Sequence, residues 1–463
     1  MSKRQKPQFE GKRVTVAGLG VSGFHTARWL AGQGAEVVVS EIRPLDELDG
    51  TVCRELEGLG VLLETGGHRE ETFVRADTVI VSPGVPLDMG PIVAARERGV
   101  PVLGELELAS RLIHTPVIAI TGTNGKSTVT ALIGELLERG GRRVFVGGNL
   151  GTPLMAFAAA GTEADAAVVE VSSFQLDTIQ TFSPAISVLL NISPDHLDRY
   201  SDYEAYVRAK LRVFENQGPE SHVVLNDDDP RLREVRPGSG RAVYRYGLEE
   251  RPGRDAFMTG GRAVVRLEGK ETDYAVDAYG LPGRHNLENL LAGLLVGHIL
   301  GIGADTVQQT INQFKGLPNR LVKVAEFKGV SFYNDSKATN VDAAARAVES
   351  LDRPLVLIAG GRHKGADYTD LVEAARGKVK GAVFLGEAAD LLSRAFAGGV
   401  PCMRTADMGA AVRAAASLAE PGDAVLLAPA CASFDMYADY AERGKAFVDA
   451  VERMINGQGQ NKG

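Results

Sequence analysis

Residues 117–128 are VIAITGTNGKST, an apolar run followed by a glycine-rich loop and the first residues of a helix. Such a loop directs successive backbone N–H groups toward one point, and the helix N-terminus adds the positive end of its dipole. Lys126 would reach the outer phosphates of a nucleotide, and the hydroxyl of Ser127 or Thr128 would bind magnesium. The general pattern has a glycine where Ile120 stands, and an ordinary strand–turn–helix with a capping serine is the alternative. The strand before the loop and the helix after it favour an ATP-binding site.

The length and composition are typical of a multidomain enzyme. The chain has 463 residues and a formal net charge of −8, and a chain of this length is expected to form about three domains of ~150 residues each. The acidic balance argues against nucleic acid as the main partner, because it leaves no extended basic face. Cys53, Cys402 and Cys431 are odd in number and widely spaced, which is typical of a reducing cytosol rather than of a disulfide framework.

Neither a secretory signal nor a membrane span is expected. The first residues, MSKRQKPQFEGKR, are basic and lack an apolar segment. The most apolar stretch, 290–302, is too short to cross a bilayer and contains His298. We therefore expect a cytoplasmic protein, a monomer, with no membrane partner.

Three segments repeat the order of short apolar strand, glycine-rich turn and amphipathic helix, which favours α/β domains with mostly parallel sheets. Residues 241–279 alternate more loosely, so we expect a small antiparallel insertion there, followed by a helix from about Asn286 to Leu300. The polar tail 456–463 is expected to fray. The expected strands are 14–17, 36–40, 78–82 and 100–103 in the first segment, 117–120, 166–169 and 186–190 in the second, and 355–359, 382–385 and 424–427 in the third.

These patterns predict three domains. Residues 1–114 are expected to form a Rossmann-like domain, residues 115–318 a central domain with a P-loop ATPase-like parallel sheet, and residues 319–463 a second Rossmann-like domain. The Thr115-Pro116 step is the expected linker between the first two domains.

The first domain contains a G-x-G-x-x-G motif, GLGVSG at 18–23, after a strand and before a helix. Glu41 ends the next strand, where dinucleotide-binding proteins carry an acid that binds ribose. Taken alone, the motif indicates a nicotinamide-dependent oxidoreductase. A dehydrogenase has no use for the second nucleotide site around Lys126, whereas one domain for ATP and another for a nucleotide-bearing substrate explains both motifs.

Several further motifs make the chain recognisable, and together with the phosphate loop they resemble the Mur ligase family over essentially the whole length. They are EVSSFQL (170–176), NISPDHLDR (191–199), GRHN (283–286) with Asn289, LPNR (317–320), DSKATN (335–340) and PACASFD (429–435). DSKATN is similar to the motif found at this position in the branch of the family that adds D-glutamate. In GGRHKG (360–365), His363 stands where many relatives have an acid or a glycine, so the local contacts at 363 are in question.

The resemblance implies a reaction. The carboxylate of UDP-N-acetylmuramoyl-L-alanine would be joined to the amino group of D-glutamate through an acyl phosphate, with ATP going to ADP and phosphate, as a step of peptidoglycan synthesis. Phosphoryl transfer needs mostly positioning and charge neutralisation. A dinucleotide-dependent dehydrogenase and a nucleotide-regulated binding protein are the alternatives. The acidic and basic set of Glu170, His196 and Lys210 has no obvious structural use and favours an enzyme.

Magnesium is the expected metal, with two ions implied. Glu170 follows an apolar strand beside the phosphate loop, where a lone carboxylate needs a cation and magnesium takes hard oxygen ligands; an N-cap or surface salt bridge is the alternative. A lone histidine is usually structural, but the resemblance makes His196 a ligand of a second ion. The implied metal ligands are Ser127, Glu170, His196 and Lys210, and the implied catalytic residues are Lys126, Glu170, His196 and Lys210.

Three groups of binding residues follow from the resemblance. The expected ATP-binding residues are Gly122, Thr123, Asn124, Gly125, Lys126, Ser127, Thr128, Asn286, Asn289, Arg320 and Asp335. The expected residues for the UDP-linked substrate are Gly20, Val21, Ser22, Glu41, Ile42, Arg43, Gly84, Asn149 and Ser172. The expected D-glutamate residues are Lys337, Thr339, Lys364, Ser433 and Tyr440, which offer cations and hydroxyls to two carboxylates.

Lys210 is expected to point inward from a helix over residues 203–214. Helical spacing places it on the stripe of Tyr206, Val207 and Phe214. Such a lysine usually extends its ammonium group to solvent, but burial would lower its pKa and favour the neutral amine. The position matches the carbamylated lysine of the Mur ligases, so the resemblance implies a carbamate that binds the second magnesium ion.

Overall fold

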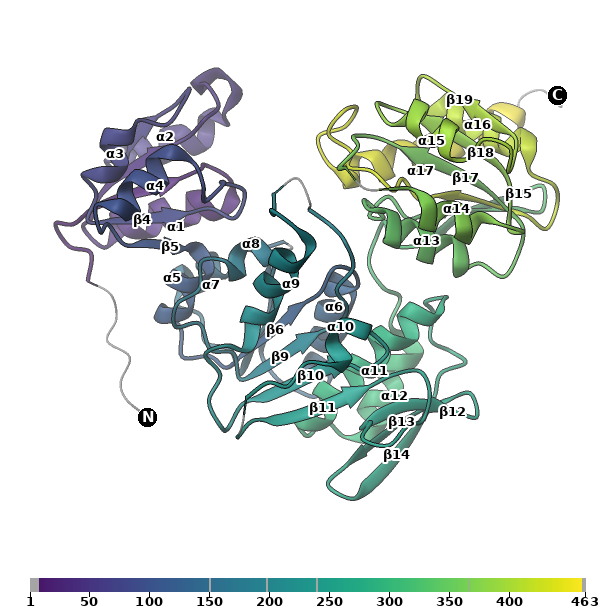
Figure 1. The fold of residues 1–463 in the computed structure, drawn as a ribbon, viewed down its shortest axis with the longest axis horizontal. Helices are drawn as coiled ribbons and strands as arrows, with labels where there is room; N and C mark the ends of the chain where they lie inside the picture. Colours follow the sequence, from purple (N-terminus) through teal and green to yellow (C-terminus); the bar gives the residue numbers. More distant parts are fainter. Residues whose placement is uncertain (1–7, 150, 197–198, 239, 366, 460–463) are drawn as a thin grey trace.

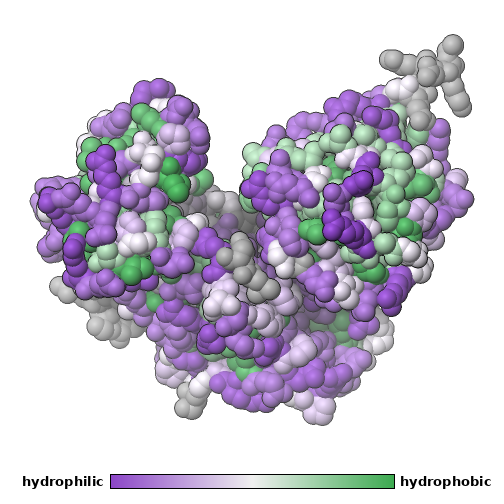
Figure 2. All heavy atoms as spheres, turned by 45° about the horizontal axis from the view of Figure 1, so that its top comes forward, coloured by the Kyte–Doolittle hydropathy of each residue, from purple (hydrophilic) through white to green (hydrophobic). Residues whose placement is uncertain are grey.

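The computed structural model describes residues 8–459 except 150, 197, 198, 239 and 366. Leu197 and Asp198 of the NISPDHLDR motif lie outside the described residues. Three α/β domains follow one another along the chain, and the first and third stand on either side of the central one (Figure 1). A deep hollow separates the two outer domains above the central domain (Figure 2). The central domain thus borders both outer domains (Figure 1).

The first domain is built on a parallel sheet of strand order β3-β2-β1-β4-β5. The four strands expected here are confirmed within two residues, whereas β3 was not predicted, because it has only three residues at the sheet edge and Leu62 is 57% exposed. The elements are β1 (Arg13–Ala17), α1 (Val21–Gly32), β2 (Glu36–Ser40), η1 (Leu45–Glu47), α2 (Gly50–Gly58), β3 (Leu62–Glu64), α3 (Glu70–Val74), β4 (Thr78–Val81), α4 (Gly90–Glu97), β5 (Val102–Gly104) and α5 (Glu105–Leu112).

The central domain has a nine-stranded sheet of order β14-β13-β12-β11-β10-β9-β6-β8-β7. The prediction of an antiparallel insertion over 241–279 is wrong in part, because β11 pairs parallel with β10 and the segment extends the main sheet. Only β12, β13 and β14 pair antiparallel. The elements are β6 (Val117–Thr121), α6 (Lys126–Arg139), β7 (Val144–Gly148), α7 (Leu154–Ala160), β8 (Ala166–Glu170), α8 (Ser173–Leu176), β9 (Ile186–Leu189), α9 (Tyr203–Leu211), η2 (Arg212–Phe214), β10 (His222–Asn226), α10 (Pro230–Arg233), β11 (Ala242–Tyr246), β12 (Ala256–Thr259), β13 (Arg262–Leu267), β14 (Lys270–Ala275), α11 (Arg284–Ile299) and α12 (Ala304–Gln313).

The third domain has a six-stranded sheet of order β15-β16-β20-β17-β18-β19, in which only β15 runs antiparallel to its neighbour. The expected fraying of 456–463 is wrong as far as Gly459, because α17 continues to that residue and Met454 and Ile455 pack on the core; residues 460–463 lie outside the described part. The elements are β15 (Val322–Phe327), β16 (Val330–Asn334), α13 (Val341–Glu349), β17 (Leu355–Gly360), α14 (Thr369–Ala375), β18 (Val379–Leu385), α15 (Ala389–Ala395), β19 (Cys402–Arg404), α16 (Met408–Leu418), β20 (Ala424–Leu427) and α17 (Tyr440–Gly459).

One apolar core joins the first domain to the central one. Buried side chains of β1 and α1 belong to the same cluster as Met155 of α7 and Phe182 of the central domain, and α1 and α5 both pack against α7. Two further clusters of buried side chains lie wholly within the third domain. The first and central domains therefore behave as one packed body.

Glu107 of α5 ties these two domains with a fully buried carboxylate. It is 0% exposed and accepts hydrogen bonds from the backbone N–H groups of Gln180, Thr181 and Phe182 at 2.9–3.1 Å. The hydroxyl of Thr181 and the guanidinium of Arg111 also donate to it. Burial alone would raise the pKa of Glu107, but these donors lower it below its ordinary value. The ionised carboxylate thus provides a hydrogen-bond acceptor for the backbone N–H groups of residues 180–182, which lie outside any strand.

We predict that Glu107→Ala lowers the free energy of unfolding by about 3 kcal/mol or more, because it leaves several buried N–H groups and the half-buried guanidinium of Arg111 without their acceptor. Hydrogen exchange of the amides at 180–182 would measure the loss locally. Because the pKa of Glu107 is lowered in the folded state, its contribution is present at neutral pH and is lost as the pH falls through that folded value. Glu138→Ala, an exposed acid on α6, is the control, and equal protection in both variants would contradict the prediction.

Candidate active site

The phosphate loop leaves β6 and enters α6 through two glycines in conformations that other residues rarely adopt. Gly122 has φ 152° and Gly125 has φ 85°, a region that favours glycine. A Cβ atom on Gly125 would meet Oδ1 of Asn289 at 2.3 Å. Gly125 is also the N-cap of α6, so the loop ends at the positive end of a helix dipole, where an anion is stabilised.

Asn191, at the end of β9, fixes the shape of this loop. Its carbonyl accepts from the N–H of Thr123 at 2.9 Å, and its Oδ1 accepts from the N–H of Asn124 at 2.8 Å. Its Nδ2 donates to the carbonyl of Asn124 at 3.1 Å. Asn191 belongs to the NISPDHLDR motif but was not predicted to have a role, although its place just after a buried strand was the available signal.

Two lysines, one buried and one half-buried, donate to the same backbone carbonyl. Nζ of Lys126 lies 2.9 Å from the oxygen of Gly122 and 2.8 Å from that of Thr123, and Nζ of Lys210 lies 2.8 Å from the oxygen of Gly122. Burial lowers the pKa of both groups, that of Lys210 far below its ordinary value. Two ammonium groups crowded in a dry site favour the neutral amine on one of them.

The inward direction expected for Lys210 is confirmed. The residue is 2% exposed, and its Nζ lies 4.6 Å from the ring centroid of Tyr206, one turn earlier on α9. The alternative, an ammonium group extended to solvent, is wrong because the side chain turns toward the phosphate loop. The helix itself ends at Leu211, and residues 212–214 form a 3-10 turn instead of the expected last helical turn.

Glu170 and Ser127 form a buried oxygen pair beside the loop. Glu170 ends β8 and is 2% exposed; its carboxylate accepts from Ser127 Oγ at 2.5 Å and from Asn149 Nδ2 at 2.8 Å. Burial would raise the pKa of Glu170, but the charge of Lys126 and these two donors lower it. Arg320, from the third domain, donates from Nη2 to Ser127 Oγ at 2.6 Å. A cation of the protein thus lies against the oxygens that suit magnesium.

His196 and Asp195 face the same space. His196 has φ 55°, and its ring packs edge-on to Phe174 with centroids 4.8 Å apart. Burial lowers the pKa of His196 to about 4 although Asp195 opposes the shift, so the imidazole is neutral at pH 7 and keeps a lone pair for a ligand. Asp195 accepts from Lys364 Nζ and Asn340 Nδ2, each at 3.2 Å.

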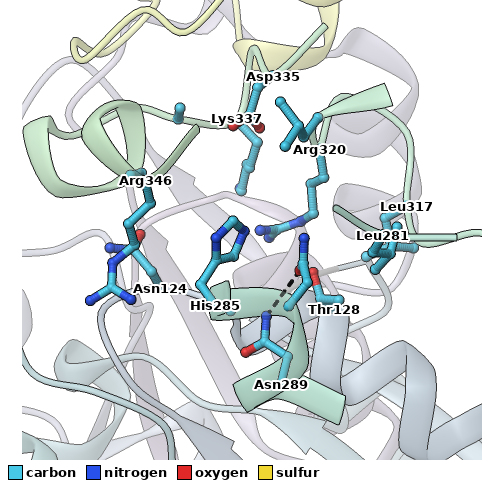
Figure 3. Close-up of a pocket in the computed structure, with 15 residues that line it drawn as sticks. Asn124, Thr128, Leu281, His285, Asn289, Leu317, Arg320, Asp335, Lys337 and Arg346 are labelled. Atoms are coloured by element: carbon cyan, nitrogen blue, oxygen red, sulfur yellow. Dashed lines mark hydrogen bonds between the residues drawn. The ribbon is translucent and has the colours of Figure 1, made fainter. Parts of the chain in front are cut away.

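A cavity between α11 and the third domain adjoins the loop (Figure 3). His285 and Asn289 rise from α11 on one side, while Arg320, Asp335 and Lys337 descend from the third domain on the other. Asn289 Nδ2 donates to Asn286 Oδ1 at 3.3 Å. Burial raises the pKa of Asp335 to about 7. The remaining predicted lining residues are Asn124, Gly125 and Thr128, and those that sequence reasoning missed are Leu281, His285, Leu317, Leu321, Ala338, Ala343 and Arg346.

A second, larger cavity continues from the loop into the gap between the central and third domains. Nζ of Lys337 lies 3.7 Å from the ring centroid of Tyr440, and burial lowers the pKa of this lysine to about 8. The predicted site residues that line it are Thr123, Asn124, Gly125, Lys126, Ser127, Asn149, Glu170, His196, Arg320, Lys337, Thr339, Lys364, Ser433 and Tyr440. The lining residues that were given no role are Phe174, Asp195, Arg199, Asn340, Arg362, His363, Gly365, Ala432, Phe434 and Asp439.

The residues expected to bind the UDP end gather elsewhere, at the carboxyl ends of β1, β2 and β4 in the first domain. They are Gly20, Val21, Ser22, Glu41, Ile42, Arg43 and Gly84. Val21 and Ile42 are 63% and 67% exposed, which leaves apolar surface for a flat ring. Ser172 caps α8 in a capping box with Gln175. Arg199 of the central domain donates to the carbonyl of Gly84 at 3.2 Å and so bridges toward this site.

The carboxylate of Glu41 is already hydrogen-bonded within the protein, unlike that of an acid available to bind ribose. Its carboxylate accepts from the N–H of Leu19 at 2.6 Å and from both N–H and Nε of Arg43 at 3.0 Å. Burial would raise the pKa of Glu41, but Arg43 and Leu19 lower it to about 2. The carboxylate is thus used to shape the glycine-rich turn, which weakens the dehydrogenase alternative.

No group of three or more His, Cys, Asp or Glu side chains in the described part of the chain could hold a metal by itself. Among the described residues, no helix is long and apolar enough to cross a membrane.

Comparisons with known proteins agree along the whole chain. Three family models match: Mur ligase MurD-like, N-terminal domain, over residues 12–104; Mur ligase middle domain, over 120–297; and Mur ligase, glutamate ligase domain, over 319–431. The UDP-N-acetylmuramoylalanine--D-glutamate ligase of Desulfosudis oleivorans is 44% identical over 97% of this chain and 98% of its own. The protein of the same name from Pelotomaculum thermopropionicum is 43% identical over 97% and 99%.

Solved structures share the fold at lower identity. A pseudomurein peptide ligase type C from Methanothermus fervidus is 20% identical with a TM-score of 0.60, covering 96% of this chain and 100% of that one. The UDP-N-acetylmuramate-alanine ligase of Thermotoga maritima is 18% identical with a TM-score of 0.60 and the same coverage. Three consecutive domain matches and full-length relatives above 40% identity lead to one conclusion: the chain belongs to the Mur ligase family.

Proposed function

We propose that the enzyme joins D-glutamate to UDP-N-acetylmuramoyl-L-alanine, converting ATP to ADP and phosphate, as a step of peptidoglycan synthesis. Full-length relatives named for D-glutamate addition support this choice within a family of ATP-dependent ligases. The single observation that carries it is the convergence of Lys126, Arg320, Lys337 and Lys364 on one cavity beside a phosphate loop. Such a site suits a triphosphate and two further carboxylates.

The chemistry explains why so many cations are needed. A carboxylate resists attack by an amine until its oxygen is phosphorylated, and the acyl phosphate then releases phosphate as the C–N bond forms. Lys126 and Arg320 would neutralise the phosphoryl group in transit. Lys337 and Lys364, with the hydroxyls of Thr339, Ser433 and Tyr440, would hold the carboxylates of D-glutamate so that its amine faces the acyl carbon. Burial lowers the pKa of Lys126 and Lys337, and each ion pair is stronger where water is partly excluded.

Magnesium fits the residues at the phosphate loop. Ser127 Oγ and Glu170 Oε2 are hard oxygens 2.5 Å apart, and the guanidinium of Arg320 already lies against Ser127. A bound ion would supply charge neutralisation for the β- and γ-phosphates. We further propose a second magnesium ion near His196, whose neutral imidazole offers a ligand, and a carbamate on Lys210 as its partner. The two side chains flank the same Tyr206 ring, at 6.4 Å between ring centroids and 4.6 Å from Nζ.

The binding assignments made from the sequence are retained as proposals. ATP would lie along the loop, with its adenosine between Asn286, Asn289 and Asp335. The UDP end would bind the exposed apolar surface of Val21 and Ile42 in the first domain, with the sugar toward Asn149. The domain boundaries at 114 and 318, the monomeric state and the cytoplasmic location stay predictions.

Lys126→Ala tests the ATP site. We expect phosphate release with UDP-N-acetylmuramoyl-L-alanine and D-glutamate to fall by at least about a hundred-fold, because a charge-assisted contact to the transferred phosphoryl group is lost. Lys270→Ala, which removes an exposed lysine on β14, is the matched control.

Wild-type enzyme should use D-glutamate far better than L-glutamate or D-alanine, since an unpaired charge in the site is penalised. Equal rates with D-alanine would refute the amino-acid assignment.

The lowered pKa of Lys337 predicts that kcat/KM for D-glutamate depends on pH. Its pKa of about 8 lies below the ordinary value for lysine, so the free enzyme loses this cation as the pH rises through about 8. We expect kcat/KM for D-glutamate in the wild type to fall above that pH relative to Lys337→Arg, because arginine stays charged. The ratio of the two profiles cancels the ionisation of the substrate amine. A ratio that is flat between pH 7 and 9.5 would contradict the assignment.

Lys210 should carry a carbamate in the active enzyme. We expect Lys210→Ala to lose activity and acetate to restore part of it, because a small carboxylate can occupy the space of the modification. Enzyme equilibrated with ¹³C-bicarbonate should show a carbamate carbon resonance that is absent from the alanine variant. An unmodified amine in a magnesium-loaded crystal, together with a fully active alanine variant, would defeat this proposal.

A further inference from the structure

The first turn of α13, in the third domain, docks directly on the phosphate loop of the central domain. Oδ2 of Asp342 accepts from Asn124 Nδ2 at 2.5 Å and from Ser193 Oγ at 3.0 Å. Asn124 lies between the two glycines of the loop, and Ser193 follows β9, whose end fixes the loop through Asn191. A single carboxylate thus bridges one domain to both segments that shape the nucleotide site of another.

Neighbouring residues hold this carboxylate in place. Nε of Arg346, one turn later on α13, lies 3.1 Å from each carboxylate oxygen of Asp342, and the two side chains are only 25% and 29% exposed. Asn340, the N-cap of α13, donates to Asn124 Oδ1 at 3.4 Å and to Asp195 at 3.2 Å. Both polar atoms of the Asn124 side chain are therefore contacted from the third domain.

The position of α13 determines where the amino-acid pocket lies. The segment that carries Lys337 and Thr339 runs directly into the helix at Val341, so a shift of its first turn moves both residues relative to the phosphates. No cluster of buried apolar side chains spans the junction between the central and third domains among the described residues. Polar contacts such as those of Asp342 therefore carry a large share of the alignment.

We propose that Asp342 is a positioning residue that aligns the D-glutamate pocket with the phosphate loop by fixing α13 against Asn124 and Ser193. The proposal rests on the proposed function, because it concerns the amino acid bound by the third domain. Asp342 touches neither phosphate nor amino acid in this role. It acts by raising the fraction of molecules in which the central and third domains are joined.

The kinetic consequence differs from that of a residue that touches substrate. Without Asp342, a larger fraction of molecules has the central and third domains apart. Part of the binding free energy of D-glutamate is then used to bring the two domains together. Saturating D-glutamate restores the closed form. KM for D-glutamate should therefore rise while kcat changes little, and the loss of a hydrogen bond to a charged group corresponds to about a ten-fold rise.

The test compares Asp342→Ala with Glu349→Gln, which removes an exposed acid from the last turn of the same helix. We expect Asp342→Ala to raise KM for D-glutamate about ten-fold, with kcat within about three-fold of wild type and an unchanged melting temperature, and Glu349→Gln to have no effect. Small-angle scattering of the nucleotide-bound enzyme should show a larger radius of gyration for Asp342→Ala. Saturating D-glutamate should restore the wild-type radius.

A double-mutant cycle with Ser193→Ala identifies the partner across the junction. If Asp342 acts through Ser193 and Asn124, the double variant should raise KM by less than the product of the two single effects. Unchanged KM in Asp342→Ala, or strictly multiplicative effects with an unchanged radius, would overturn the proposal. An inactive wild-type enzyme with D-glutamate would instead refute the proposed function, so the two failures are distinguishable.

Discussion

The structure depends on an excess of half-buried positive charge at the junction of the central and third domains. Lys126 and Lys337 are buried deeply enough for desolvation to lower their pKa values, and Arg320 and Lys364 line the same cavity. Among the described residues, the acids that line this cavity are Glu170, Asp195 and Asp439. Such an arrangement is costly in the isolated protein and becomes favourable when anions fill the cavity. Anions bound in this cavity would therefore relieve an unfavourable electrostatic interaction between its cations.

Much of the fold could be predicted from the sequence, because its central strands are continuous apolar runs and its turns are marked by glycine. The strand at Val117–Thr121 and the helix at Lys126 follow the expected bounds closely. The inward side chain of Lys210 also followed from spacing alone. The edge strands β3 and β19 were not predicted, since they have three residues each and little burial. The interior strand β10 (His222–Asn226) was not predicted either, although four of its five residues are buried. The strands β15 and β16 were not predicted either, because their strand conformation depends on pairing with each other and of β16 with β20 rather than on a local sequence pattern.

The site was predictable only where a motif names the residues. Most residues expected from the family motifs line one of two adjoining cavities, although their roles await experiment. The residues that position them were not visible in the sequence, because their partners are distant in the chain. Asn191 contacts a loop 67 residues away, and Asp342 contacts Asn124 over 218 residues. Glu107 likewise looks like one more helical acid until the backbone of Gln180 to Phe182 folds onto it.

The continuity of the apolar core has a consequence for how such an enzyme diversifies. Side chains of the first and central domains interdigitate in one cluster, whereas the two clusters of the third domain include no residue before Leu321. Substitutions inside the third domain can therefore change its packing without disturbing the apolar core that the first and central domains share. The third domain can thus diverge in sequence as a module while the joint packing of the other two domains is kept.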